Sequence, residues 1–230
     1  MLKKFFNFEF SSLSFFPKTE TLGIYVQYPI ADLECAQAMG TICKKKYKIK
    51  YLNHSTLTEK SLKNIDCLVF PGGLEDVDNF DHLLRDKKEV VQKYLANGGK
   101  YLGICMGGYL AGKHYFNILK NVDAVQYIKR KNAELRYEHE TVTPVRWRGK
   151  TYKMFFYDGC ALIGDQSGFK TIARYKNGDP MAIIQGDIGV IGCHPESPKY
   201  WYENTPFEKY WHGGRDHELL LDFIEELMDN

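Results

Sequence analysis

One cysteine in this chain has the surroundings of a catalytic nucleophile. Cys105 follows a short apolar run and precedes two glycines and a segment able to form a helix, in the sequence YLGICMGGYLAG. A strand, a sharp turn and a helix make a nucleophile elbow, and its strained turn needs small neighbours, here Gly103 and Gly107. The N-terminus of the following helix is expected to favour the thiolate. The alternative interpretation is a buried strand cysteine followed by a glycine-rich turn.

A thiol nucleophile needs a base, and the base needs a carboxylate that orients it. Both are present in the sequence GVIGCHPE, where we predict a strand that ends at His194, with Glu196 two residues further on. Side chains two residues apart in an extended segment share a face, and Pro195 between them disfavours a helix. We therefore predict that Cys105, His194 and Glu196 form a catalytic triad. The alternative is a solvated histidine in a polar loop.

The first half of the chain alternates between apolar runs and amphipathic segments. We predict strands at residues 22–28, 47–52 and 66–70, and helices at residues 31–43 and 81–96. This alternation is typical of an α/β fold with a parallel sheet and helices on both faces. Ligands bind at the carboxyl ends of such strands, which is where the sequence Pro-Gly-Gly at residues 71–73 and Cys105 both lie.

After residue 121 the pattern changes to short strands joined by tight turns such as Arg148-Gly149 and Asn177-Gly178, and Asn-Gly is typical of antiparallel hairpins. The predicted strands are residues 141–147, 152–157, 170–175, 181–185 and 188–193, and a closing helix is predicted at residues 214–228. We expect a single domain over residues 21–230, preceded by a tail of residues 1–20. The aromatic residues between Trp201 and Trp211 form either a wall of the substrate site or a packed cover over the core.

Composition limits the classes of partner and location. The net charge of +2 gives no reason to expect nucleic acid, and no apolar run is long enough to span a membrane. None of the six cysteines forms a Cys-x-x-Cys pair, so we expect reduced, buried thiols, with no metal site and no cofactor. We expect a cytoplasmic protein. Secretion through the aromatic N-terminal segment is the minority alternative, because Glu9 interrupts that segment and no cleavage site is evident.

Three motifs together resemble the class I glutamine amidotransferase superfamily: Pro-Gly-Gly at residues 71–73, GICMGG around Cys105, and CHPE around His194. The sequences FPGGLEDVDNF, NGGKYLGICMGGYLAG and FYDGC, in that order, look most like the branch that resembles the N-terminal domain of biotin–protein ligase. The resemblance implies a flavodoxin-like three-layer sandwich with a mostly parallel central sheet. It also implies a Cys-His-Glu triad and an oxyanion hole made by backbone N–H groups at Gly73 and Met106.

One position departs from the superfamily, which usually carries a glutamine four residues after the nucleophile. Tyr109 stands there, and a phenol cannot replace both the donor and the acceptor of an amide. We therefore expect a cysteine hydrolase or amidase that acts on a small-molecule or peptide amide other than free glutamine. The residues expected to bind this substrate are Gly72, Tyr109, Tyr157 and Asp158.

Two other functions stay open at this point. The first is an inactive binding or regulatory module on the same scaffold, working with a partner protein or as a homodimer. The second is a redox or small-carbonyl enzyme of the PfpI-like branch, which pairs its cysteine with an acid from the first strand–helix region. Glu34 is the candidate for that acid.

Overall fold

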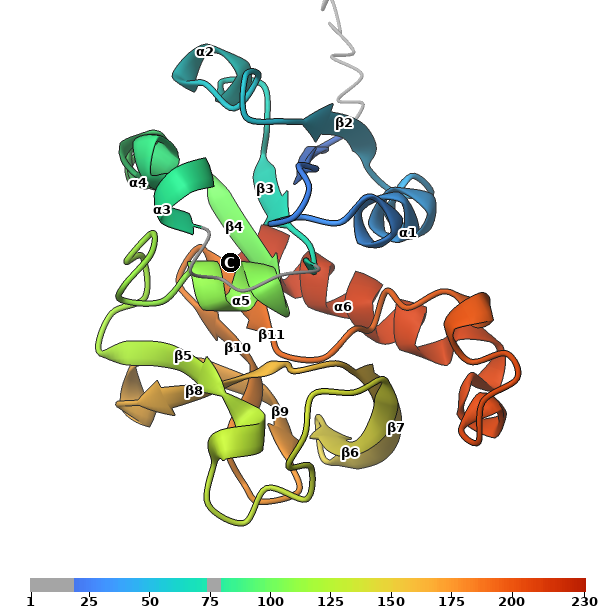
Figure 1. Ribbon diagram of the computed structural model, residues 1–230. Helices are drawn as coiled ribbons and strands as arrows, with labels where there is room; N and C mark the ends of the chain where they lie inside the picture. The colour runs from blue at the N-terminus through green and yellow to red at the C-terminus, as the bar shows by residue number, and fades with distance from the viewer. Residues whose placement is uncertain (1–18, 74–79) are drawn as a thin grey trace, which may run out of the picture.

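The computed structural model describes residues 19–73 and 80–230, and within these ranges the chain forms one nine-stranded sheet and a separate two-stranded ribbon. The strand order of the large sheet is β2-β1-β3-β4-β11-β10-β9-β6-β7, and the ribbon pairs β5 with β8 (Figure 1). The strands are β1 (Thr21–Tyr25), β2 (Lys48–Leu52), β3 (Cys67–Phe70), β4 (Lys100–Ile104), β5 (Val122–Gln126), β6 (Thr141–Trp147), β7 (Lys150–Phe156), β8 (Cys160–Gly164), β9 (Lys170–Tyr175), β10 (Pro180–Gln185) and β11 (Ile188–Ile191). Most of the predicted tail, residues 1–18, lies outside the described residues.

The first five strands of that order are parallel and run β2-β1-β3-β4-β11, which is the order of flavodoxin-like sheets. The remaining pairs, from β11 through β10, β9 and β6 to β7, are antiparallel. The sequence-based prediction of a flavodoxin-like α/β sandwich is therefore confirmed. The antiparallel half of the sheet returns the chain to the parallel half, where β11 pairs with β4 next to the elbow.

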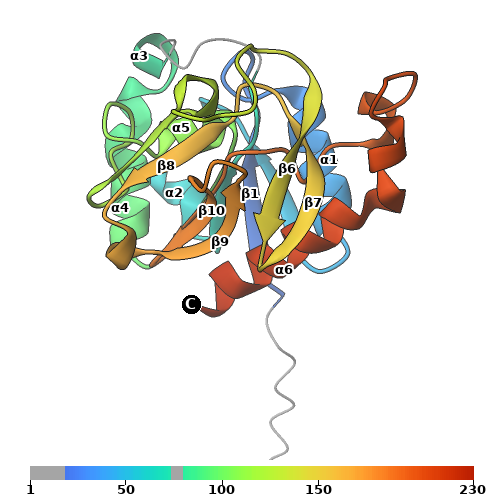
Figure 2. The ribbon, with the colours of Figure 1, turned by 90° about the horizontal axis from the view of Figure 1, so that it is seen from below.

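Helices cover both faces of the sheet (Figures 1 and 2). Helix α1 (Leu33–Cys43) packs with α6 (Arg215–Asp229) on one face, where their apolar side chains share a cluster with Ile104 and Ile191. Helices α2 (Glu59–Leu62), α4 (Lys88–Ala96) and α5 (Met106–Leu110) cover the other face. The β5–β8 ribbon packs beside α5 on this second face. The three-layer arrangement buries the parallel strands on both sides, as their apolar sequences require.

The helix predicted over residues 81–96 is interrupted. The chain instead forms α3 (Phe80–Leu83), a 3₁₀ turn (Arg85–Lys87) and α4. The break lies at Leu84, whose backbone (φ −136°, ψ −5°) is not helical and whose side chain is fully buried in the core. Burial of Leu84 overrides the continuous helical pattern, since packing commonly outweighs intrinsic helix propensity.

Both tight turns predicted in the second half are present. Arg148-Gly149 joins β6 to β7 with positive φ at both residues, as a two-residue hairpin loop requires, and Gly178 has φ +93° between β9 and β10. The sequence analysis missed two strands, β5 and β8. The ribbon they form is short, and it holds residues 157–159 directly before β8, close to the elbow.

A close approach of α5 to β3 makes Gly107 a sensitive position for stability. A Cβ atom added there would lie 1.9 Å from the carbonyl oxygen of Phe70, so the backbone of β3 or α5 would have to move. We expect Gly107→Ala to lower the free energy of unfolding by about 2–3 kcal/mol, measured by urea denaturation. Gly168→Ala is the control, because its Cβ would meet its nearest neighbour at 3.6 Å. Equal stability of the two variants would contradict the close approach.

Candidate active site

Cys105 lies at the junction of β4 and α5, where the sequence predicted a nucleophile elbow. Its backbone adopts φ +49° and ψ −104°, a strained conformation for a residue with a side chain. The strain is held in place by close packing: a Cβ at Gly103 would lie 2.2 Å from the carbonyl oxygen of Gly107. The Cys105 N–H also donates a hydrogen bond of 2.9 Å to the carbonyl oxygen of Ile191 at the end of β11. The sheet therefore fixes both sides of the turn.

His194 and Glu196 meet as the sequence suggested, but through a different backbone. Strand β11 ends at Ile191, three residues before His194, and residues 192–196 form a bend and a turn. In this turn His194 Nδ1 lies 2.9 Å from Glu196 Oε1, and both side chains are buried. The backbone N–H of His194 donates to the carbonyl oxygen of Phe155 on β7, which anchors the turn to the antiparallel half of the sheet.

The charge state of His194 is set by two opposing effects. Burial disfavours a charged imidazole, but the neighbouring charges of Cys105 and Glu196 outweigh it and raise the pKa of His194 well above its ordinary value. Hydrogen bonding to the thiols of Cys105 and Cys35 acts in the same direction. The imidazole therefore lies between a carboxylate and two sulfur atoms, which is an arrangement suited to proton transfer.

The loop after β3 lies directly against the imidazole. A Cβ at Gly72 would lie 2.7 Å from His194 Cε1 and 3.0 Å from Cys35 Sγ, so only glycine fits between the two side chains. A Cβ at Gly73 would lie 2.5 Å from the carbonyl oxygen of Ile30, which places Gly73 against the connection from β1 to α1. Gly72 thus lies against the imidazole, and Gly73 is the next residue of the same loop. Residues 74–79 of the same loop lie outside the described residues.

The turn before β8 forms another side of the site. Cys105 Sγ donates to the carbonyl oxygen of Tyr157 over 3.5 Å, and Tyr109 Oη donates to the carbonyl oxygen of Asp158 over 3.0 Å. Asp158 has φ +44°, and its Oδ2 accepts a hydrogen bond of 2.8 Å from Gln126 on β5. The structure therefore brings the backbone of Tyr157 beside Cys105 and joins Asp158 to Tyr109 on α5.

The aromatic segment after His194 packs over the imidazole. The ring centroid of Trp201 lies 5.7 Å from that of His194 and 4.9 Å from that of Phe155. Trp201 Nε1 and Tyr200 Oη both donate to Glu34 Oε2, which ties this segment to the start of α1. Glu34 was the candidate for the acid that a PfpI-like enzyme pairs with its cysteine. Its carboxylate is instead bonded to these two aromatic side chains, which gives no support to that role. The residue of α1 that reaches the site is Cys35, which the sequence analysis did not single out.

All six cysteines are free and buried, as predicted from their spacing. Burial raises the pKa of the thiols of Cys35 (to about 11), Cys43 (to about 12), Cys67, Cys160 and Cys193. Cys193, next to the histidine, belongs to the core, with its Sγ 3.9 Å from Tyr175 Oη.

We expect iodoacetamide at neutral pH to modify Cys105 before any other cysteine, because it lies at the elbow beside a charged imidazole. Peptide mapping by mass spectrometry over a time course measures the order of modification. Labelling in urea, where all six thiols are exposed, is the control for intrinsic peptide detection. Preferential labelling of Cys160 or Cys193 in the folded protein would contradict the assignment of Cys105 as nucleophile.

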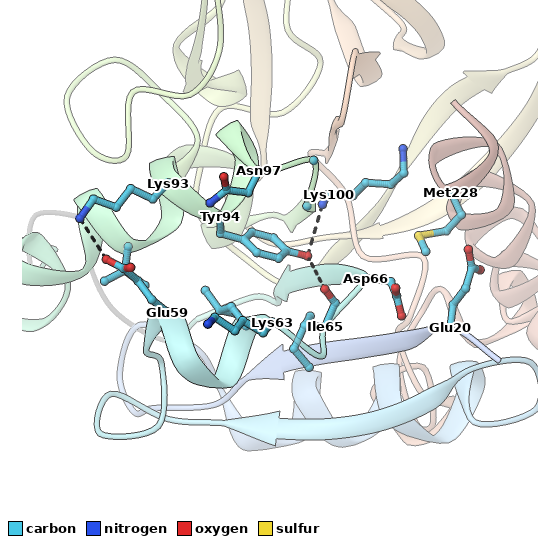
Figure 3. Close-up of a pocket in the computed structure, with 14 residues that line it drawn as sticks. Glu20, Glu59, Lys63, Ile65, Asp66, Lys93, Tyr94, Asn97, Lys100 and Met228 are labelled. Carbon is cyan, nitrogen blue, oxygen red and sulfur yellow. Dashed lines mark hydrogen bonds and ion pairs between the residues drawn. The ribbon is translucent and has the colours of Figure 1, made fainter. Parts of the chain in front are cut away.

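A separate pocket of about 540 Å³ lies at the opposite edge of the sheet, at the amino ends of β3 and β4 (Figure 3). Its walls include Tyr94, whose Oη donates to the carbonyl oxygen of Ile65 and accepts from the Lys100 N–H, and the Lys93–Glu59 ion pair. Cys105 lies at the carboxyl end of β4, and His194 and Glu196 follow the carboxyl end of β11. This pocket is therefore no part of the candidate active site.

The family model for the N-terminal region of biotin–protein ligase matches residues 31–161, which is more than half of the chain. No curated protein matched the sequence. Among solved structures, a glutamine amidotransferase from Thermotoga maritima aligns with a TM-score of 0.66 at 12% identity, covering 92% of this chain and 99% of that one. The structure of PurLQS from Thermotoga maritima aligns with a TM-score of 0.62 at 13% identity, covering 90% and 99%. Within the described residues no helix is long and apolar enough to cross a bilayer. The chain thus belongs to the biotin–protein ligase N-terminal family and has the fold of the class I glutamine amidotransferases.

Proposed function

We propose that this chain is a cysteine hydrolase of the amidotransferase type, with Cys105 as nucleophile, His194 as base and Glu196 as the carboxylate that orients the imidazole. The observation that carries the proposal is the buried bond of 2.9 Å between His194 Nδ1 and Glu196 Oε1, beside a cysteine held at φ +49°. A buried ion pair and a strained nucleophile both cost stability, and such costs cluster at functional sites.

In the proposed reaction His194 takes the thiol proton of Cys105, and the sulfur attacks the carbonyl carbon of an amide. Backbone N–H groups of Gly73 and Met106 stabilise the oxyanion; Met106 is the first residue of α5, where N–H groups have no acceptor within the helix. His194 protonates the leaving nitrogen, and the C–N bond breaks to give an acyl-enzyme. Water then attacks the acyl group while His194 takes its proton, which releases the acid and restores the thiol.

The proposed substrate is a small-molecule or peptide amide with an apolar portion, and free glutamine is a poor one. Two features of the candidate site support this choice. Tyr109 is buried beside the nucleophile with its hydroxyl bonded to Asp158, and Trp201 and Phe155 present aromatic rings next to His194. An apolar group packed on these rings would gain favourable burial. Gly72, Tyr157 and Asp158 complete the proposed binding residues.

A second function, a binding or regulatory module without turnover, is favoured by one observation. Cys105 is 6% exposed and His194 is 4% exposed, so the reacting atoms have little contact with solvent. In this case the partner of the module is another protein or a second copy of the chain. The amidase could work with the same two kinds of partner.

Labelling with an activity-based probe, followed by a substrate screen, separates the two functions. The probe should carry a small electrophilic amide mimic, and the screen should cover glutamine, small amides and peptides. Labelling of Cys105 that depends on His194, together with turnover of any amide, supports the hydrolase. Absence of labelling in the folded chain, with normal labelling of Cys105 after unfolding, would support the module without turnover.

A further inference from the structure

Cys35, His194 and Glu196 form a compact set of metal-ligating side chains. One ligand atom from each side chain, a sulfur, an imidazole nitrogen and a carboxylate oxygen, lies within 4.8 Å of the other two. All three residues are buried, with Cys35 5%, His194 4% and Glu196 0% exposed. Thiolate, imidazole and carboxylate are together the ligand types that bind Zn²⁺ in proteins.

Glu196 supplies an independent indication of a cation. Its Oε1 is bonded to His194, whereas its buried Oε2 finds no hydrogen-bond partner within residues 19–73 and 80–230. A buried carboxylate oxygen without a partner is costly, and an ion is one of the few groups that remove this cost.

The absence of a side chain at Gly72 lets the sulfur of Cys35 and the imidazole of His194 lie close together. A Cβ at this position would lie 2.7 Å from His194 Cε1 and 3.0 Å from Cys35 Sγ. Ligands of a tetrahedral zinc ion lie roughly 3.3–3.8 Å apart, given bonds of about 2.0–2.3 Å. The ligand atoms here, within 4.8 Å of one another, need side-chain movements of only about 1 Å to reach that geometry.

We propose that Cys35, His194 and Glu196 bind a zinc ion, and that this ion inhibits the hydrolase. Cys35 binds as the thiolate, and its proton is released to water. Zinc takes an imidazole nitrogen of His194 and the carboxylate of Glu196, whose Oε2 gains a partner, so His194 can no longer act as a base. The inhibition rests on the proposed function, whereas zinc binding by these three side chains does not. The sequence could not indicate this set, since Cys35 lies on α1 and its two partners follow β11.

The first experiment measures metal binding without any substrate. Zinc is titrated into the reduced full-length chain in competition with a chromophoric chelator, and Co²⁺ is used as a spectroscopic probe of sulfur ligation. We expect about one equivalent per chain, with thiolate-to-cobalt charge-transfer absorption. Loss of a residue that only hydrogen-bonds to a metal ligand weakens metal binding by about 10–100-fold. Cys35 is a proposed ligand itself, so we expect Cys35→Ala and Cys35→Ser each to weaken zinc binding by about 100-fold or more.

Controls separate this site from other thiols. Cys67→Ala removes a buried thiol from β3 and should bind zinc as the wild type does; Cys105→Ser should also retain the ion, because the proposed ligands do not include Cys105. Glu196→Gln provides a second test if either Cys35 variant fails to fold, as judged by circular dichroism. Unchanged zinc affinity in the folded Cys35 variants, or loss of the ion in Cys105→Ser alone, would overturn the proposal.

Activity measurements then distinguish the two proposals. If zinc inhibits turnover and a chelator restores it, the result supports both the inhibitory zinc site and the hydrolase. Specific zinc binding by Cys35 in a chain that turns over no amide keeps the metal site and removes the hydrolase. Turnover that resists saturating zinc overturns the inhibition.

Discussion

Replacing Cys105 or His194 by alanine is expected to lower kcat by about 10⁴-fold or more, and the double variant is expected to be little worse than either single one. The reason is that the sulfur and the imidazole act on the same proton. Once either is missing, the other has no step to perform, and their contributions cannot add. The measurement is steady-state hydrolysis of the best amide found in the screen, with Cys67→Ala as the matched control for loss of a buried thiol.

Glu196→Gln is expected to be milder than either alanine substitution. The amide keeps the shape of the side chain and can still bond to His194 Nδ1, but it no longer stabilises a positive imidazole. Additive losses in the Cys105 and His194 double variant would mean separate roles and would contradict a triad.

The sequence predicted the parts of the site that depend on local order along the chain. The position of Cys105 between a strand and a helix could be predicted because a strand, a turn and a helix follow one another within twelve residues, and each has its own residue signature. The turn at Arg148-Gly149 was predictable for the same reason, since the positive φ of both residues depends on the turn itself.

The parts that depend on packing between distant segments could not be predicted. The break at Leu84 arises because the core buries that side chain, and no residue nearby signals a helix end. The spacing of His194 and Glu196 predicted that both would lie on one face of a strand, but the two meet in a turn after β11. Cys35 is the clearest omission, because only the three-dimensional contact between α1 and the loop at Gly72 places its sulfur beside the imidazole.

Free glutamine is expected to be hydrolysed by the wild-type chain with a kcat/KM about 10³-fold or more below that of the preferred amide. A substrate that needs hydrogen bonds is rejected strongly by a site that cannot supply them. Tyr109 stands where the superfamily usually has a glutamine. Its single O–H is already donated to the carbonyl oxygen of Asp158 at 3.0 Å, and its ring is buried beside Cys105. The side chain therefore offers glutamine no free donor and occupies space next to the nucleophile.

Tyr109→Gln tests this reasoning directly, because it restores an amide that can both donate and accept. We expect this variant to raise kcat/KM for glutamine and to lower it for the preferred amide, whose apolar portion loses an aromatic contact. Tyr109→Phe is the matched control: it removes the bond to Asp158 but supplies no amide, so glutamine should stay a poor substrate. Ammonia release from glutamine is measured for all three proteins with a coupled assay. Efficient glutamine hydrolysis by the wild type would contradict the prediction, since the buried tyrosine would then have to be compatible with an amide substrate that it cannot bond.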